Sequence, residues 1–313
     1  MKILVFGGGG FIGSAIVDRL LLDRHQVRVF ERPRVALYRQ FTATESIEWV
    51  TGEFSSATDV THAMIGVDVV LHLVSTTLPK TSNDNPIYDV QSNLVSTLKM
   101  LNVMIDQKVR RIIFISSGGT VYGKPTYVPI DELHPTEPMV SYGITKLAIE
   151  KYLQLYQHLY GLNVTILRVA NPYGERQRIG TAQGAVTVFL DRALKGLPIE
   201  IWGDGSVTRD YLHVSDVAEA FARAVSYSGA KNCFNISSGT GTSLNELVSI
   251  IREVSRQEVE VRYFPGRSFD VPVNVLSNDL ARTELNWVPS ISMHDGIGRV
   301  ATWMRSVLES KTL

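Results

Sequence analysis

The residues most able to do chemistry in this 313-residue chain are Tyr142 and Lys146, which stand four positions apart in the sequence SYGITK. Residues at this spacing lie on one face of a helix, so the phenol and the ammonium can serve a single reaction centre. A free tyrosine has a pKa of about 10 and is a poor base at neutral pH, but a nearby positive charge favours the phenolate. The spacing therefore predicts a site that moves a proton.

A glycine-rich turn near the N-terminus predicts a dinucleotide site. Residues 7–10 are all glycine, and together with Gly13 they follow a short apolar run and open a helical pattern. In that context the free amides of the helix N-terminus can hold a pyrophosphate. A G-x-G-x-x-G register starting at Gly8 and a G-x-x-G-x-x-G register starting at Gly7 both end on Gly13. The residues expected at the cofactor are Gly7, Gly10, Phe11, Ile12 and Gly13.

Glu31 ends the next predicted strand, close to the position expected of an acid that binds the ribose hydroxyls of a dinucleotide. A carboxylate there favours NAD over NADP, because it would repel a 2′-phosphate. Arg32 and Arg34 follow it, and a nearby arginine is how that phosphate is accommodated. NAD is therefore the expected cofactor, and NADP stays possible.

The elements that must position these residues alternate between strands and helices. Apolar and β-branched runs predict strands at residues 3–6, 27–30, 67–73, 111–115 and 163–168, with helices at residues 11–22, 88–107 and 142–160. This alternation is typical of a parallel, doubly wound α/β sheet. Prolines and glycines become denser after residue 173. We therefore expect one lobe at residues 1–173, with return segments at about 212–240, and a smaller lobe at residues 174–313.

Composition excludes several classes of function. Lys plus Arg and Asp plus Glu both number 31, so no overall basic field recruits nucleic acid. The one cysteine, Cys233, excludes a disulfide framework and suits a reducing, cytoplasmic setting. No apolar run approaches the roughly 18 residues of a membrane span, so we expect no membrane anchor. The histidines have no ligand spacing, and no catalytic metal is expected.

Three further motifs complete a family resemblance. They are SSGGTVYG at residues 116–123, RVANPYG at residues 168–174, and GDGSVTRDYLHVSD at residues 203–216. With the glycine turn and the Tyr-Lys pair, the chain resembles an extended short-chain dehydrogenase/reductase of the nucleotide-sugar epimerase and dehydratase branch over nearly its whole length. The resemblance implies a Rossmann-type doubly wound sheet, a smaller α/β lobe that binds a nucleotide sugar, and NAD.

The resemblance also assigns roles to the central pair. Tyr142 would take a proton from a sugar hydroxyl as hydride leaves the same carbon for NAD. Lys146 would lower the pKa of the tyrosine and bind the nicotinamide ribose. Further residues that the resemblance places at the cofactor are Arg32, Glu53, Phe54, Leu73 and Asn93.

One position departs from the family's pattern. Relatives carry Ser or Thr three residues before Val-Tyr-Gly to bond the reacting oxygen, and this chain has Gly118 there. Ser117 and Thr120 are both candidates for the missing catalytic hydroxyl. The adjacent Asp-Glu pair with which dehydratases eliminate water is replaced by Gly119 and Thr120, which argues against dehydration.

The substrate end is implied by a second set of residues. Planar guanidinium groups suit diphosphate, because each can pair with two oxygens at once. Arg209 and Arg267 match the family's phosphate-binding arginines, and Asp270 matches its partner for a ribose hydroxyl. The remaining substrate residues are Trp202 for stacking on the base, Asn171 for phosphate or sugar, and Asn274 for the space around the sugar.

The sequence predicts an NAD-dependent epimerase that acts at carbon 4 of a UDP-hexose through a transient 4-keto sugar. The close alternative is an NAD(P)H-dependent reductase of nucleotide-linked 4-keto-6-deoxy sugars, for which Arg32 and Arg34 are the best support. A non-catalytic dinucleotide sensor is a third reading, although a sensor has no need of the Tyr142–Lys146 pair. Relatives dimerise through the helices predicted at residues 88–107 and 142–160, so we expect a homodimer.

Overall fold

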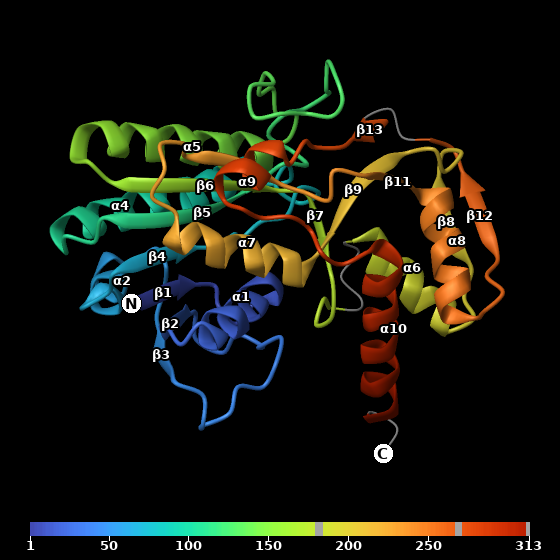
Figure 1. Ribbon diagram of the computed structural model, residues 1–313, viewed down its shortest axis with the longest axis horizontal. Coiled ribbons are helices and arrows are strands. Elements are labelled where there is room, and N and C mark those ends of the chain that lie inside the picture. The colour runs from blue at the N-terminus through green and yellow to red at the C-terminus, as the bar shows by residue number, and fades with distance from the viewer. Residues whose placement is uncertain (179–183, 267–270, 311–313) are drawn as a thin grey trace.

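The computed structural model describes residues 1–178, 184–266 and 271–310, and Figure 1 shows them as two adjoining regions. A large sheet with helices on both faces lies on the left of that view, and a smaller region of helices and short strands lies on the right. The N-terminus belongs to the first region and the last helix to the second. Within the described residues, no helix is long and apolar enough to cross a bilayer.

The large sheet has seven parallel strands in the order β10-β6-β5-β4-β1-β2-β3. Its order reverses between β1 and β4, and doubly wound sheets bind ligands at the carboxyl edge of such a reversal. Helices cover both faces, which is why a strand such as β1 is an almost continuous apolar run. The predicted doubly wound α/β fold is confirmed. The strands are β1 (Lys2–Phe6), β2 (Gln26–Glu31), β3 (Ile47–Thr51), β4 (Val69–His72), β5 (Arg111–Ser117), β6 (Asn163–Val169) and β10 (Cys233–Ile236).

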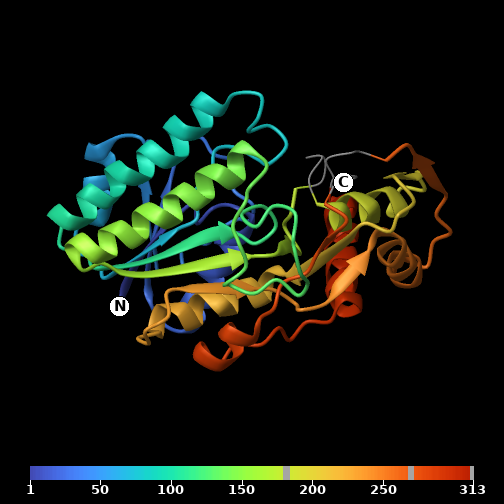
Figure 2. The same cartoon turned by 90° about the horizontal axis from the view of Figure 1, so that it is seen from above.

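Two helical layers enclose this sheet. On one face α1 packs against α7, and they bury Leu20 and Phe221 in one core. The other face is covered by α2, α4 and α5, which bury Met100 and Leu153 in a second core. Figure 2 shows the teal α4 and the green α5 side by side over that face. The bounds are α1 (Phe11–Leu22), α2 (Ala57–Met64), α4 (Ser96–Asp106), α5 (Ser141–Tyr160), α7 (Val214–Ser226) and α9 (Asp279–Glu284).

The single helix predicted at residues 88–107 is wrong in one respect, because a π-helical turn interrupts it. The segment consists of α3 (Pro86–Asp89), η1 (Val90–Val95) and then α4. Within η1 the side chain of Asn93 is buried and donates to Asp89 and Thr77. Such turns are rare and frequently mark functional sites. Apolar periodicity gives no sign of this one, because contacts with another part of the chain stabilise it.

The second region builds its own core from α6, α8 and α10, which pack on one another and on short strands. Ile199, Leu247 and Val300 are fully buried there. The two-stranded sheet pairs β8 with β12, and the four-stranded sheet joins β7, β11 and β13 to β9. The bounds are α6 (Ala185–Leu194), α8 (Leu244–Ser255), α10 (Met293–Ser310), β7 (Asn171–Tyr173), β8 (Ile199–Trp202), β9 (Thr208–His213), β11 (Gly241–Ser243), β12 (Val261–Phe264) and β13 (Val273–Asn274).

The chain passes between the two regions more than once. After β9 it returns to the large sheet as α7, which packs on α1, and as β10, which pairs with β6. It then leaves as β11, comes back as α9 against β10, and ends as α10 against α8. Neither region is therefore one continuous stretch of sequence.

Candidate active site

The first turn of α5 carries Tyr142 and is capped by the loop after β4. Val140, which precedes the helix, provides no side-chain cap. Instead Asn83 Oδ1 accepts from the Ser141 amide at 2.9 Å, and Ser82 Oγ accepts from the Tyr142 amide at 3.0 Å. These bonds satisfy amides that a helix leaves unpaired at its start. The position of Tyr142 therefore depends on two side chains that are distant in the sequence, with 58 and 60 positions separating the bonded residues.

Burial dominates the electrostatics of the Tyr142–Lys146 pair. Lys146 is 4% exposed, its Nζ donates to the Ile115 carbonyl at 3.0 Å, and Nζ lies 5.6 Å from the centre of the Tyr142 ring. Burial lowers the pKa of Lys146 to about 8, although the charges of Glu150 and Asp89 act in the opposite direction. Burial raises the pKa of Tyr142 to about 12, and the charge of Asp89 adds to that rise.

The direction found for Tyr142 differs from the sequence-based expectation. The Tyr-Lys spacing predicts that the ammonium lowers the pKa of the phenol, whereas in the structure the loss of hydration outweighs any such effect. The ammonium is hydrogen-bonded to the end of β5. The phenolate of Tyr142 is therefore scarce near neutral pH unless further positive charge is brought to the site.

The loop after β5 contains the departure from the family's pattern. A Cβ on Gly118 would collide with Leu276 Cδ1, so a serine cannot replace this glycine without movement. Thr120 Oγ1 is buried and has no hydrogen-bond partner among the described residues. A buried hydroxyl without a partner is uncommon and calls for a functional or solvent explanation. Ser117 Oγ lies 4.0 Å from where a Cβ on Gly119 would stand.

The glycine turn has the shape that a dinucleotide needs. Gly7 has φ +87°, and a Cβ on Gly13 would overlap the Gly7 carbonyl, so both positions require glycine. Gly10 precedes α1 without a side-chain cap, and a Cβ there would meet only the Gly7 carbonyl, at 3.3 Å. A Cβ on Gly8 would also come within 2.9 Å of Val29, so the structure fits both registers. Phe11 and Ile12 begin the helix, and the open amides fit a pyrophosphate.

Glu31 lies at the carboxyl end of β2, next to this turn. Its Oε1 accepts from the Gly9 amide at 2.8 Å, and burial raises its pKa. The Gly9 carbonyl accepts from the Tyr38 amide at 3.0 Å, which brings the loop after β2 onto the glycine turn. Arg32 and Arg34 are exposed at the start of that loop. The structure therefore places Glu31 directly beside the glycine turn.

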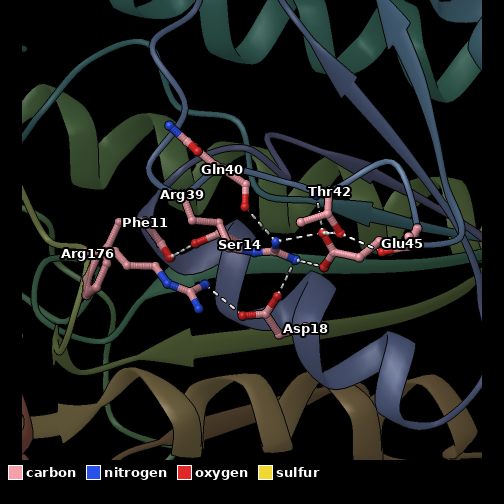
Figure 3. Close-up of polar contacts among 9 residues, drawn as sticks. Phe11, Ser14, Asp18, Arg39, Gln40, Thr42, Glu45 and Arg176 are labelled. Atoms are coloured by element: carbon pink, nitrogen blue, oxygen red, sulfur yellow. Dashed lines mark hydrogen bonds and ion pairs between the residues drawn. The ribbon is translucent and has the colours of Figure 1, made fainter.

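The loop at residues 32–46 is held by a shared carboxylate (Figure 3). Asp18 on α1 lies 2.6 Å from Arg39 Nη2 and 2.7 Å from Arg176 Nη1, which follows β7. Glu45 lies 2.5 Å from the same Arg39 nitrogen. One cluster thus joins the loop to α1 and to the segment that leads into the second region. No sequence motif indicated it, because its members come from separate polar stretches.

The other predicted cofactor residues are spread around this cradle. The Glu53 side chain is exposed, and Phe54 packs edge-on against Phe6 at 5.2 Å between ring centres. Leu73 is partly buried at the end of β4. Burial lowers the pKa of the adjacent His72 to about 3, so this imidazole is neutral. In the described residues, no group of His, Cys, Asp and Glu is placed to hold a metal.

Asn93, also predicted at the cofactor, has its carboxamide bonded within the protein. Its Nδ2 donates to Thr77 Oγ1 at 3.1 Å and to Asp89 Oδ1 at 2.9 Å, and its Oδ1 accepts from the Thr76 amide at 2.9 Å. Asp89 is fully buried beside the active pair. No pattern in the sequence selects Asp89, since one acid in a polar helix start resembles a solvated charge.

A cavity of about 300 Å³ in the second region is lined by several residues, among them the predicted substrate residues Trp202, Arg209 and Asn171. The Trp202 ring stacks on Phe264 with 5.7 Å between centres and an interplanar angle of 27°. Arg209 Nη1 donates to the Val271 carbonyl at 2.7 Å, so its guanidinium is held at the cavity wall. The cavity thus combines an aromatic face with a fixed cation.

Two asparagines approach the loop after β5, and one of them, Asn171, also lines this cavity. Asn171 Nδ2 donates to the Asp210 carbonyl at 2.8 Å, and its Oδ1 lies 3.7 Å from where a Cβ on Gly119 would stand. Asn274 is 3% exposed and its Nδ2 lies 3.4 Å from the Gly118 carbonyl. The predicted Arg267 and Asp270 lie outside the described residues.

Comparisons with known proteins agree with this geometry. The model of the NAD dependent epimerase/dehydratase family matches residues 3–237. A UDP-glucose 4-epimerase of Mycolicibacterium smegmatis is 35% identical over 98% of this chain and 99% of its own. A dTDP-4-dehydro-6-deoxyglucose reductase of Escherichia coli is 29% identical over 97% of each chain. The structure of a UDP-glucose 4-epimerase from Thermotoga maritima, solved with UDP-glucose, has a TM-score of 0.93 at 32% identity and covers 98% of this chain and 100% of that one.

The family match covers most of the chain, and the glycine cradle with Glu31 fits the cofactor in the family's name. The predicted family resemblance and the predicted NAD cofactor are confirmed at this level. The chain belongs to the NAD-dependent epimerase/dehydratase family.

Proposed function

We propose that this protein catalyses the 4-epimerisation of a UDP-hexose through a transient 4-keto sugar. The observation that carries the proposal is the position of Tyr142 and Lys146 between two sites. On one side, the glycine turn after β1 and the loops after β4 and β5 lie at one edge of a parallel sheet. On the other side, Asn171 lines the cavity and approaches Gly119 in the β5 loop. We propose that a sugar attached to a nucleotide in the cavity extends past Asn171 and Gly119 to Tyr142.

Each residue of the pair has a separate task. Tyr142 accepts the proton of the sugar's 4-hydroxyl and returns it to the epimer, and Lys146 contributes the positive charge that ionisation of a phenol with a pKa of about 12 requires. Bound NAD supplies reversible hydride transfer. Thr120, whose hydroxyl has no partner in the described protein, is our choice over Ser117 for the bond to the reacting oxygen.

The substrate lobe is proposed to bind the UDP moiety. The stacked Trp202 offers a face for the base, and Arg209 offers a guanidinium for phosphate. Asn274, buried against Gly118, would act on the sugar only through the catalytic loop. We further propose the division into an NAD-binding lobe, residues 1–173 with returns at about 212–240, and a nucleotide-sugar lobe at residues 174–313.

We also propose a homodimer in the cytoplasm. Apolar side chains on α5, including Leu155 and Leu159, are 43% and 57% exposed. An apolar helical stripe of this kind suits pairing with a second copy. The burial of Cys233, which raises the pKa of its thiol to about 12, is compatible with a reducing compartment.

The deciding experiment incubates the purified protein with UDP-glucose, UDP-N-acetylglucosamine or UDP-glucuronate without added cofactor. Products are resolved by anion-exchange chromatography. We expect a 4-epimer of at least one sugar, because an epimerase regenerates its NAD in each cycle. No epimer from any of them would refute the proposal for these sugars.

The alternative is reduction of a nucleotide-linked 4-keto-6-deoxy sugar. It is favoured by similarity to the E. coli reductase and by the exposed Arg32 and Arg34 beside Glu31. That reaction consumes NAD(P)H stoichiometrically, so cofactor absorbance falls only when the keto sugar is added. An absorbance assay with NAD(P)H and the keto sugar therefore separates the reductase from the epimerase.

Replacing Tyr142 by Phe tests whether the protein is a catalyst or a sensor. We expect turnover to fall by about a thousandfold, because the proton acceptor is lost, while NAD stays bound. Tyr152→Phe on the same helix, where the side chain is 38% exposed, is the matched control. Turnover that survives in the Tyr142 variant would contradict the mechanism.

A further inference from the structure

Asp89 is a carboxylate with no exposed surface that lies beside the catalytic pair. Its Oδ2 accepts hydrogen bonds from Ser141 Oγ at 2.7 Å and from Thr145 Oγ1 at 2.8 Å. Its Oδ1 accepts from Asn93 Nδ2 at 2.9 Å and from Thr77 Oγ1. Although burial favours the neutral acid, these bonds hold the pKa of Asp89 below its usual range. The group is therefore a fixed negative charge.

The two donors from α5 stand directly next to the catalytic residues in the chain. Ser141 precedes Tyr142, and Thr145 precedes Lys146. One oxygen of Asp89 thus holds α5 at both positions, and its other oxygen is bonded to Asn93 in the π-helical turn η1. A rotation of α5 that moved either catalytic side chain would break these bonds.

The charges around this site set Asp89 apart. The ionisable groups that face it or its neighbours are Tyr142, Lys146 and Glu150 on α5, His72 on β4 and Arg168 on β6. His72 is neutral. Glu150 is ion-paired with Arg168 at 2.6 Å, and its charge also favours the protonated form of Lys146. The hydrogen-bond donors to Asp89 in the described chain are all neutral groups. Its negative charge therefore acts on the catalytic pair without a cation of its own.

We propose that Asp89 is a positioning residue for the Tyr142–Lys146 pair: its carboxylate locks α5 against the π-helical turn and places a negative charge beside both groups. A negative charge stabilises a nearby ammonium and opposes a nearby phenolate, so it acts on both groups in the same direction. The contribution of Asp89 to turnover rests on the proposed epimerase function, whereas its effect on the titration of Lys146 does not.

The first test measures the titration of Lys146 without any activity assay. Protein with ¹³C-labelled lysine is titrated by NMR, and the Lys146→Met spectrum identifies the signal. In Asp89→Asn, which keeps the shape and removes the charge, we expect Lys146 to titrate at lower pH than in the parent protein. Thr145→Val removes one bond and keeps the charge, so its Lys146 titration should stay close to that of the parent. An unchanged titration in Asp89→Asn would overturn the electrostatic role.

The second test uses the pH profile of kcat/KM with the sugar that the protein epimerises. Removing the charge lowers the pKa of both Tyr142 and Lys146, so both limbs of the profile should move to lower pH in Asp89→Asn. A merely structural role would lower the height of the profile and leave its limbs in place. If the NMR shift occurs but the parent protein epimerises no sugar, the proposed function fails and the electrostatic role of Asp89 stands.

The double variant Ser141→Ala with Thr145→Val tests the lock on α5, and it serves also if Asp89→Asn does not fold. It retains the carboxylate and removes both bonds to α5. We expect kcat to fall about tenfold or more with little change in KM, because small displacements of catalytic groups cost rate. An unchanged kcat would overturn the positioning role.

Discussion

At the scale of single residues, the question left open by Gly118 is which hydroxyl replaces the usual serine. Leu276 Cδ1 occupies the space that a side chain at position 118 would need. Ser117 and Thr120 are the two candidates, and burial of the hydroxyl oxygen favours Thr120. Thr120 Oγ1 is buried without a partner in the described protein, and it would gain one from the substrate.

We therefore predict that Thr120→Val lowers kcat about a hundredfold, because it keeps the side-chain shape and removes one donor to the reacting oxygen. Thr120→Ser should restore most of the rate. Ser117→Ala is the matched variant, and it should cost less than Thr120→Val. Steady-state kinetics with the preferred sugar decide the assignment, and the reverse order of effects would give the role to Ser117.

A second prediction at this scale concerns pH. Burial lowers the pKa of Lys146 to about 8, so the ammonium is lost as pH rises through that value. Because the phenolate of Tyr142, with a pKa of about 12, and the ammonium of Lys146 must coexist, kcat/KM should rise with pH up to about 8 and level off above it, where each gain in phenolate is matched by a loss of ammonium. Lys146→Arg, which stays charged, should remove this break near pH 8 from whatever activity remains. Lys151→Arg, at an exposed position of the same helix, should leave it in place.

At the scale of elements, the loop at residues 32–46 covers the glycine turn and is held by Arg39 (Figure 3). We predict that Arg39→Met weakens NAD retention about tenfold, because the loop loses its bonds to Asp18 and Glu45. Bound NAD is measured by absorbance after gel filtration and acid release. Arg282→Met breaks an exposed ion pair with Asp279 and should retain NAD like the parent protein. Equal retention in both variants would contradict a holding role for the loop.

Which elements the sequence could predict depended on where their stabilising contacts lie. Helix α1 has the predicted bounds, because its apolar spacing is local. Strand β3 was not predicted, since it lies at the sheet edge with Glu48 and Trp49 exposed and shows no apolar alternation. The turn η1 was not predicted either, because it rests on bonds to Thr77 and Asp89.

The residues of the candidate site also differ in whether a local sequence pattern could predict them. Tyr142 and Glu31 belong to short motifs whose chemistry follows from local spacing. Asp89 and Leu276 act through neighbours that are distant in sequence, so no local pattern marks them. The burial that raises the pKa of Tyr142 is not visible in the sequence for a related reason, because spacing reports the nearby charge and not the loss of water.

At the scale of the whole molecule, we predict a dimer that depends on the exposed face of α5. Leu155→Arg with Leu159→Arg should yield monomers, because two charges are placed in an apolar contact. Analytical ultracentrifugation over a range of concentrations measures the change in mass. Leu133→Arg, at a side chain that is 91% exposed in a loop, should leave the dimer intact. A parent protein that is already monomeric would refute the proposal.

The repeated passage of the chain between its two regions limits how such a protein can diversify. Because α7, β10 and α9 return to the large sheet between segments of the smaller region, no single crossover in the gene could exchange the smaller region as one piece. A new sugar preference must then arise through substitutions within the cavity. Overall sequence similarity among homologues is therefore expected to be a poor guide to which sugar each one prefers. Replacing a set of cavity residues should transfer sugar specificity better than splicing the smaller region of one homologue into another.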